Sequence, residues 1–261
     1  MTKGKTRDEI AEAYSSEPWW YDIRGFFILT FAYNSTINTQ LRFFGPHFGP
    51  NHLEVACGTG TLLELVLRWR KWKKMKPVKV TGIDYAPSML AGAKKRFAND
   101  PQVQVQHADA ANLPFPDASF DTANIANSIH CFPTVDEALR DINRVLKPGG
   151  TLAANVLLYP DGIAPLRWAA QNINDWGIKK GILYSPFEQQ DIRQRFIAAG
   201  YEISREFNNA PMPYSIYFTN NGHAFHLDDP AVDSNGCVHL PPDAAKRYWD
   251  NVQVGDKVFI Y

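Results

Sequence analysis

The sequence predicts an α/β fold in which a doubly wound, mostly parallel sheet carries helices on both faces. Apolar strand patterns alternate strictly with helix patterns from residue 52 to residue 158. Such alternation indicates parallel strands, because each crossover helix returns the chain to the same end of the sheet. The chain has 261 residues, 45% of them apolar, which is enough to bury one large core.

The alternating region starts after two Gly-Pro pairs, at residues 45–46 and 49–50, which end an aromatic-rich segment predicted to be helical over residues 7–45. The predicted strands span residues 52–56, 78–83, 103–107, 120–126 and 151–158. The predicted helices span residues 61–72, 87–97 and 134–146, and the last begins with a capping-box pattern. Each of these helices connects two strands that are consecutive in the sequence.

The last third of the chain departs from this regular alternation. Residues 159–184 form an insertion, and the next helix, over residues 185–200, starts with a capping box and a proline at its first helical position. Two late strands follow, at residues 201–207 and 214–219. We therefore expect three parts: an N-terminal helical cap (1–50), a core (51–219) whose insertion near 159–184 lines a substrate pocket, and a C-terminal extension (220–261).

The composition indicates which classes of binding partner and which cellular location to expect for the protein. Lys and Arg together number 27, as do Asp and Glu, so no global field recruits nucleic acid or an anionic membrane. The three cysteines are widely spaced and lack a CxxC pair, so we expect no disulfide framework, no structural metal site and a reduced, cytoplasmic location. The longest apolar stretch, residues 25–33, is much shorter than the ~20 residues that span a bilayer.

Three features follow the ends of three consecutive predicted strands. They are the turn at Gly58 and Gly60, then Asp84, then Asp109, spaced by roughly 25 residues, which is one strand–helix unit. The carboxyl ends of parallel strands meet at one edge of a sheet, where ligands bind in open α/β folds. We therefore expect these residues to lie side by side in a ligand site.

The residues around the turn indicate which ligand this is. No Lys stands near Gly60, as a triphosphate-binding loop requires, and Leu63 takes the place of the third glycine of a dinucleotide turn. Glu54 lies inside the preceding strand. Carboxylates repel a pyrophosphate but suit a ligand that carries an ammonium and a sulfonium, and S-adenosylmethionine is such a ligand.

Each site residue has a possible role toward this cofactor and a structural alternative. Asp84 would accept both ribose hydroxyls or cap the next helix, and Asp109 would accept from the adenine amine, with the Ala110 amide nearby, or cap a turn. Glu54 would lie near the amino group or be a buried acid satisfied by backbone amides. Tyr85 and Met89 would enclose the adenine or pack in the core. The remaining expected cofactor contacts are Ala56, Cys57 and Asn127.

Four stretches together resemble class I S-adenosylmethionine-dependent methyltransferases. They are LEVACGTG at 53–60, VTGIDYAPSML at 80–90, HADAANLPFPDASFD at 107–121 and RVLKPGGTL at 144–152. The run from 112 to 121 is most similar to the branch that methylates ubiquinone and menaquinone precursors and other small molecules. The resemblance implies a Rossmann-like, seven-stranded sheet whose last strand is antiparallel. Ala56 stands where the family pattern usually has glycine.

The candidate catalytic residues are fewer than the candidate cofactor contacts. His130, after the fourth strand, is the best titratable candidate for a general base, and its alternative is a helix-cap or supporting histidine. Tyr21 in the N-terminal helices would contact cofactor or substrate, or simply pack. Methyl transfer needs mainly an aligned acceptor and a dry site, so no triad is required.

We expect the acceptor to be a small, partly apolar or aromatic molecule that takes the methyl on O, N, S or C. Two alternatives from other classes are an NAD-dependent oxidoreductase of the same topology and a non-catalytic S-adenosylmethionine-binding protein. A nucleic-acid methyltransferase is a weaker variant of the main hypothesis. The basic stretch 68–76 is typical of a patch that binds nucleic acid or a membrane. The helix dipole also stabilises cations at a helix C-terminus, which favours a solvated helix end. If the stretch binds anything, we expect it to tether the protein rather than to form the active site.

Overall fold

The protein is described here from a computed structural model with two compact units, Met1–Tyr201 and Glu202–Tyr261. No helix among the residues that the structure describes is long and apolar enough to cross a membrane. The described residues are 8, 9, 12, 37–159, 168, 171, 172, 174–176, 178, 179, 184–203, 216, 217, 224–227 and 238–240.

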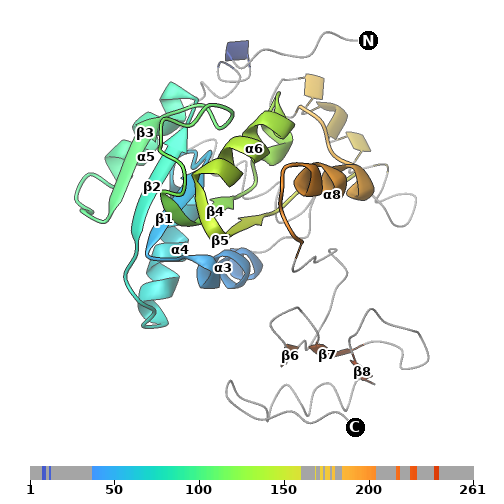
Figure 1. Ribbon diagram of the computed structural model, residues 1–261, viewed down its shortest axis with the longest axis horizontal. Coiled ribbons are helices and arrows are strands. Elements are labelled where there is room, and N and C mark those ends of the chain that lie inside the picture. The colour runs from blue at the N-terminus through green and yellow to red at the C-terminus, as the bar shows by residue number, and fades with distance from the viewer. Residues whose placement is uncertain are drawn as a thin grey trace. The chain divides into compact units, whose positions relative to one another are not determined.

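The first unit contains a five-stranded sheet in the order β3-β2-β1-β4-β5, and every neighbouring pair in it is parallel (Figure 1). The order reverses at β1, so the switch point, where open α/β sheets bind ligands, lies between β1 and β4. The strands are β1 (Asn51–Val55), β2 (Lys79–Asp84), β3 (Val103–His107), β4 (Phe120–Ile125) and β5 (Leu146–Ala154).

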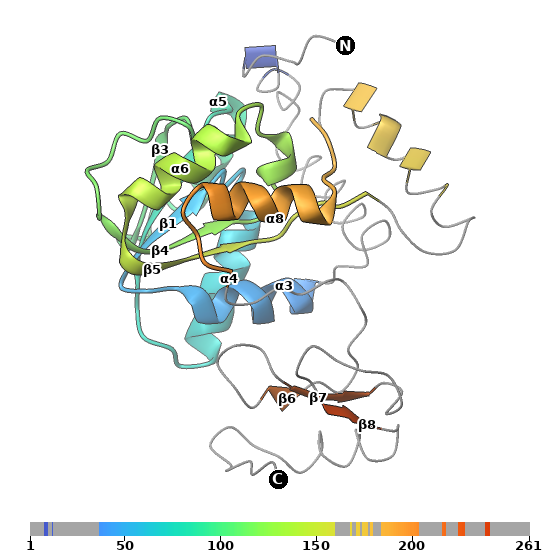
Figure 2. The same cartoon turned by 45° about the vertical axis from the view of Figure 1, so that its right-hand side comes forward.

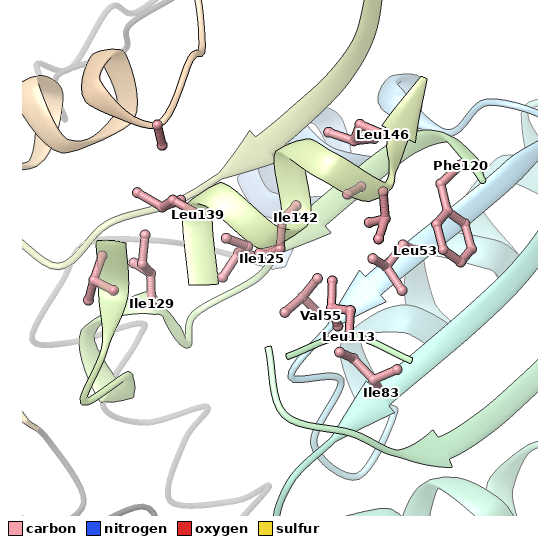
Figure 3. Close-up of a cluster of buried hydrophobic side chains, with 14 of the residues drawn as sticks. Leu53, Val55, Ile83, Leu113, Phe120, Ile125, Ile129, Leu139, Ile142 and Leu146 are labelled. Carbon is pink, nitrogen blue, oxygen red and sulfur yellow. The ribbon is translucent and has the colours of Figure 1, made fainter. Parts of the chain in front are cut away.

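Helices cover both faces of this sheet, which confirms the doubly wound arrangement. On one face, α6 and α8 bury Leu139, Ile142 and Ile192 against apolar strand residues such as Leu53 and Ile125 (Figures 2 and 3). A second cluster on the other face holds side chains from α3 and α4 and from the end of α5. The helices are α3 (Ile37–Phe44), α4 (Thr61–Trp72), α5 (Pro87–Arg96), α6 (Val135–Val145) and α8 (Gln189–Ala198), with the short helices η2 (Gly45–His47) and η3 (Ile129–Cys131).

The expectation of seven strands with an antiparallel last strand is wrong for the described sheet, which has five strands and ends in the parallel β5. Of the predicted late strands, residues 201–203 form no strand, and β6 (Ile216–Tyr217) belongs to the second unit. There β6 pairs antiparallel with β7 (Ala224–Leu227), which in turn pairs parallel with β8 (Val238–Leu240). Pairing across a six-residue connection costs little loop-closure entropy, so β6 finds a local partner.

Two element boundaries also differ from the prediction. Helix α8 begins at Gln189 rather than at residue 185, because Phe187 is extended and pairs with the chain beyond β5. The Phe187 N–H donates to the Leu157 carbonyl (2.9 Å), and the Tyr159 N–H donates to the Phe187 carbonyl (3.0 Å). Strand β5 begins at Leu146, five residues earlier than expected, with a register shift opposite Phe120 and Thr122.

Candidate functional site

A pocket opens at the carboxyl ends of β1, β2 and β4, beside the loops that follow β3 and β4. It brings together most of the residues that the strand ends predict. The lining residues are Ala56, Gly58, Ile83, Asp84, Tyr85, Ala86, Met89, Ala108, Asp109, Ala110, Ala111, Asn127, Ser128, Cys131, Phe132, Pro133, Thr134 and Ala138. Most of these side chains are apolar, so the few polar groups orient whatever binds.

The turn after β1 places glycine where the backbone requires it. Ala56, Gly58 and Gly60 all have positive φ, of 52°, 58° and 77°. A Cβ added at Gly58 would meet no atom within 4 Å, so this glycine leaves an open cradle in the pocket wall. At Gly60 an added Cβ would lie 2.5 Å from the Phe97 ring, so that glycine is needed for packing against the end of α5.

The guanidinium of Arg96, at the end of α5, holds the far side of the same turn. It donates to the Thr59 carbonyl (3.0 Å), to the Thr61 hydroxyl (2.7 Å) and to the Glu64 carboxylate (2.6 Å). These three bonds join the turn and the first residues of α4 to α5. The turn is therefore fixed before any ligand arrives, which lowers the entropy cost of binding.

Asp84 joins the ends of β1 and β2. Its carboxylate accepts from the Gly58 N–H (2.7 Å) and from the Ala86 N–H (2.8 Å), and burial raises its pKa above the usual value. Each oxygen keeps a second lone pair for a ligand hydroxyl. The two interpretations made from the sequence are thus compatible, because the side chain both orders the backbone at the start of α5 and lines the pocket.

The residues expected around adenine also reach the pocket. Met89 is buried in the wall, and Tyr85 lies near His107, with ring centroids 5.1 Å apart, while its hydroxyl donates to Asp8 (2.9 Å). Asp109 accepts from the Ala111 N–H (3.0 Å), so it orders its own turn as well as lining the pocket beside Ala110.

Glu54 lies outside the pocket lining, on the buried face of β1. Its carboxyl is 3.2 Å from the His52 ring and 3.4 Å from the Asn124 amide, which donates to it. Burial raises the pKa of Glu54 to about 8, so this acid is mostly neutral at pH 7. Burial, with the nearby Arg70 charge, lowers the pKa of His52 to about 3. The charge argument for a sulfonium ligand therefore rests on Asp84 and Asp109 rather than on Glu54.

Asn127, at the end of β4, uses its side chain to join neighbouring elements. Its amide donates to Gln40 on α3 (2.8 Å), and its oxygen accepts from Asn155, whose own oxygen accepts from the Asn127 N–H (2.6 Å). The residue has a φ of 56°. With its side chain engaged in this way, Asn127 presents mainly backbone to the pocket that it lines.

The loop after β4 contributes more of the wall than the sequence analysis predicts. Phe132, Pro133 and Thr134 line the pocket, and only their position after the fourth strand signalled them. His130 lies in η3 of this loop, and burial lowers its pKa to about 4. The Ser128 hydroxyl and His130 Nδ1 are buried and have no hydrogen-bond partner among the described residues.

Several predicted residues lie elsewhere. Cys57 is beside the turn but not in the lining, and burial raises the pKa of its thiol well above the usual range. Tyr21 lies outside the described residues. The insertion near 159–184 was expected to line a substrate pocket, but Trp168 and Trp176, among its described residues, are exposed and do not line this one. In the described part of the chain, no group of three or more His, Cys, Asp or Glu side chains is placed to hold a metal ion.

Two family models match the chain. A methyltransferase domain matches residues 53–154, and an L,D-transpeptidase catalytic domain matches residues 154–260. Demethylmenaquinone methyltransferase of Staphylococcus aureus is 39% identical over 107 residues, which are 41% of this chain and 42% of that protein. The chain thus spans less than half the length of the curated relatives that it matches.

Solved structures share the fold at low sequence identity. A chain of the complex between the Haloferax volcanii Trm112 methyltransferase activator and a putative methyltransferase has a TM-score of 0.53 and 22% identity, covering 75% of this chain and 77% of that one. A methyltransferase from Thermotoga maritima, described as a possible histamine N-methyltransferase, has a TM-score of 0.50 and 21% identity, covering 71% and 79%.

The parallel sheet, the turn beside Asp84 and these matches agree on one class of domain. Residues 53–154 belong to the class I S-adenosylmethionine-dependent methyltransferases, of the type that includes demethylmenaquinone methyltransferase. The resemblance drawn from the sequence motifs is confirmed, and an NAD-dependent oxidoreductase is not favoured.

Gly58→Ala tests whether the cradle belongs to the cofactor, and Gly149→Ala is its matched control. Both glycines have positive φ, of 58° and 77°, and both have open space at the Cβ position, but only Gly58 lines the pocket. Both substitutions should lower the melting temperature by a few degrees through similar backbone strain. Only Gly58→Ala should weaken S-adenosylhomocysteine binding, by at least about tenfold in calorimetry. Equal affinity of the two variants for this ligand would contradict the assignment.

Proposed function

We propose that the chain transfers the methyl group of S-adenosylmethionine to an O, N, S or C atom of a small, partly apolar or aromatic molecule. The proposal rests on the pocket, which joins the open cradle at Gly58 and the Asp84 carboxylate to the apolar loop after β4. S-adenosylmethionine supplies an electrophilic methyl group on a positively charged sulfur. The chain's own residues hold the cofactor, orient the acceptor and exclude water.

We infer that the acceptor enters beside the loop after β4. Phe132, Pro133 and Cys131 offer it an apolar surface, and Ser128 offers a buried hydroxyl without a described partner. A phenol, thiol or amine acceptor forms its new bond to carbon with its own lone pair, while the carbon–sulfur bond breaks. Where the acceptor carries a proton, we propose that His130 accepts it, since this residue lies in the same loop between the pocket-lining Ser128 and Cys131.

The activity is tested by incubating the full chain with methyl-labelled cofactor and a panel of phenols, quinols, thiols and amines. We expect label on at least one small acceptor, with stoichiometric release of S-adenosylhomocysteine. The Gly58→Ala variant should reduce the rate at limiting cofactor. Label transferred only to RNA or protein, or cofactor binding without any turnover, would contradict the proposal.

The role of His130 is tested by the pH dependence of kcat. Its imidazole, with a pKa lowered to about 4, is neutral and able to accept a proton at every pH above that value. A base of this kind predicts a rate that falls only as the pH approaches 4, not near the ordinary histidine value of about 6.5. His130→Gln should lower kcat by about a hundredfold and leave cofactor affinity unchanged. His47→Gln, on η2 at the opposite end of β1, is the control. An unchanged kcat in His130→Gln would show that His130 is not the general base.

A second candidate activity concerns the C-terminal unit, because the L,D-transpeptidase match covers residues 154–260. The first part of that match packs with the methyltransferase unit: Ile192 and Ala199 are buried in its core, and the Tyr201 hydroxyl donates to the Leu139 carbonyl (3.0 Å). The rest of the match, residues 202–260, lies in the second compact unit. We propose that this part carries an acyl-transfer site.

Transfer of an acyl group between amines requires a nucleophile, and Cys237 is the single cysteine after residue 201. The backbone of β7 and β8 pairs His226 with His239, two residues beyond Cys237 in the sequence. We expect the full chain to form an acyl-thioester on Cys237 with a peptide that contains an L-residue–D-residue amide, releasing the amine portion. Intact-mass analysis should lose this adduct in Cys237→Ala. No adduct, or an adduct on Cys57 or Cys131, would contradict the proposal.

A further inference from the structure

The end of α4 and the turn after it carry a dense group of exposed cations. Arg68, Lys71, Lys73, Lys74, Lys76 and Lys79 are all exposed, and the sequence has no acidic residue between Glu64 and Asp84. We call these six residues, with Trp72, the α4 basic patch. The chain as a whole has balanced charge, so this patch is a local concentration and not part of a general positive field.

Five of these six cations have no carboxylate partner among the residues that the structure describes. Arg68 pairs with Glu64 (2.6 Å), but none of the five lysines makes an ion pair with a described residue. By contrast, Arg96, Arg144, Lys147 and Arg195 each bind a carboxylate. The α4 basic patch therefore keeps its charge available for an anionic partner.

Trp72 stands exposed among these lysines. Its side chain is 71% exposed, and the Lys73 ammonium lies 4.5 Å from its ring centroid. An indole beside ammonium groups matches the boundary between lipid headgroups and acyl chains, where Trp and Lys are both stabilised.

The patch rests on a fixed backbone. The buried Arg70 donates to the Gly45 carbonyl and to the Lys76 carbonyl (3.0 Å), and it lies over the Phe48 ring at 5.1 Å. The Met75 N–H donates to the Arg70 carbonyl (3.0 Å). The helix end and the following turn therefore present the lysines and Trp72 together.

The helix dipole alone does not account for this arrangement. The last turn of α5 also ends in three basic residues, but there Arg96 is paired, and the aromatic residue that follows, Phe97, is buried. The dipole stabilises cations at both helix ends. Of these two helix ends, only that of α4 has an exposed aromatic side chain beside its lysines, and the dipole does not explain this difference.

We propose that the α4 basic patch docks the protein on an anionic phospholipid surface. Helix α4 starts at the glycine turn and runs for 12 residues, so its basic end lies roughly 18 Å from the pocket edge. Docking there leaves the pocket open for an acceptor. The inference does not depend on the proposed activity.

Vesicle co-sedimentation of the full chain tests the proposal. The protein should bind vesicles of 30% phosphatidylserine in phosphatidylcholine, should not bind pure phosphatidylcholine, and should dissociate as salt rises. Replacing Lys71, Lys73 and Lys74 with Gln should weaken vesicle binding by more than about tenfold, and Trp72→Ala should weaken it further. Lys94→Gln with Lys95→Gln, at the exposed end of α5, is the matched control and should bind like the unmodified chain.

Calorimetry with S-adenosylhomocysteine checks that each variant is folded, since the patch lies away from the pocket. Equal binding to neutral vesicles, or equal losses in the α4 and α5 variants, would overturn the proposal. So would tighter binding to a single-stranded RNA of 20 nucleotides than to anionic vesicles. If the triple variant does not fold, the salt dependence and lipid selectivity of vesicle binding by the unmodified chain still test the proposal.

Discussion

The hydrogen bond from the Gly58 N–H to the Asp84 carboxylate, at 2.7 Å, is the contact on which the site depends. It joins the ends of β1 and β2, and β1 borders the switch point of the sheet. Arg96 holds the turn from the side of α5, and the Ala86 N–H holds the other carboxylate oxygen. The backbone at Gly58 therefore has its shape without a ligand, and the carboxylate beside it is already oriented.

Most of the first unit follows from local patterns. Apolar strands alternating with helices predict the parallel sheet, and roughly equal spacing predicts that Gly58, Asp84 and Asp109 share one edge. The strand predicted at 214–219 contains β6, but the expectation that it joins the large sheet was wrong. A short connection lets β6 pair with β7 instead, because strand pairing depends on which partner the chain can reach. The start of α8 was wrong because a backbone pairing of Phe187 overrode a favourable capping pattern.

Within the site, sequence patterns predicted well which residues lie together. They predicted less well which atoms of those residues face the pocket. The sequence suggests Glu54 as a charged cofactor contact, yet burial raises its pKa to about 8, and its carboxyl contacts His52 and Asn124 outside the pocket lining. Asn127 reaches the pocket, but Gln40 accepts from its side-chain amide and Asn155 donates to its side-chain oxygen. Burial and hydrogen-bond partners come from tertiary packing, so a sequence pattern does not reveal them.

The central claim is that this turn and the Asp84 carboxylate hold a sulfonium cofactor rather than a dinucleotide. Calorimetric titration of the full chain with S-adenosylhomocysteine and, separately, with NADH tests it most directly. The account predicts saturable binding of S-adenosylhomocysteine, weakened by Asp84→Ala, and no measurable binding of NADH. Saturable binding of NADH with no binding of S-adenosylhomocysteine would contradict it.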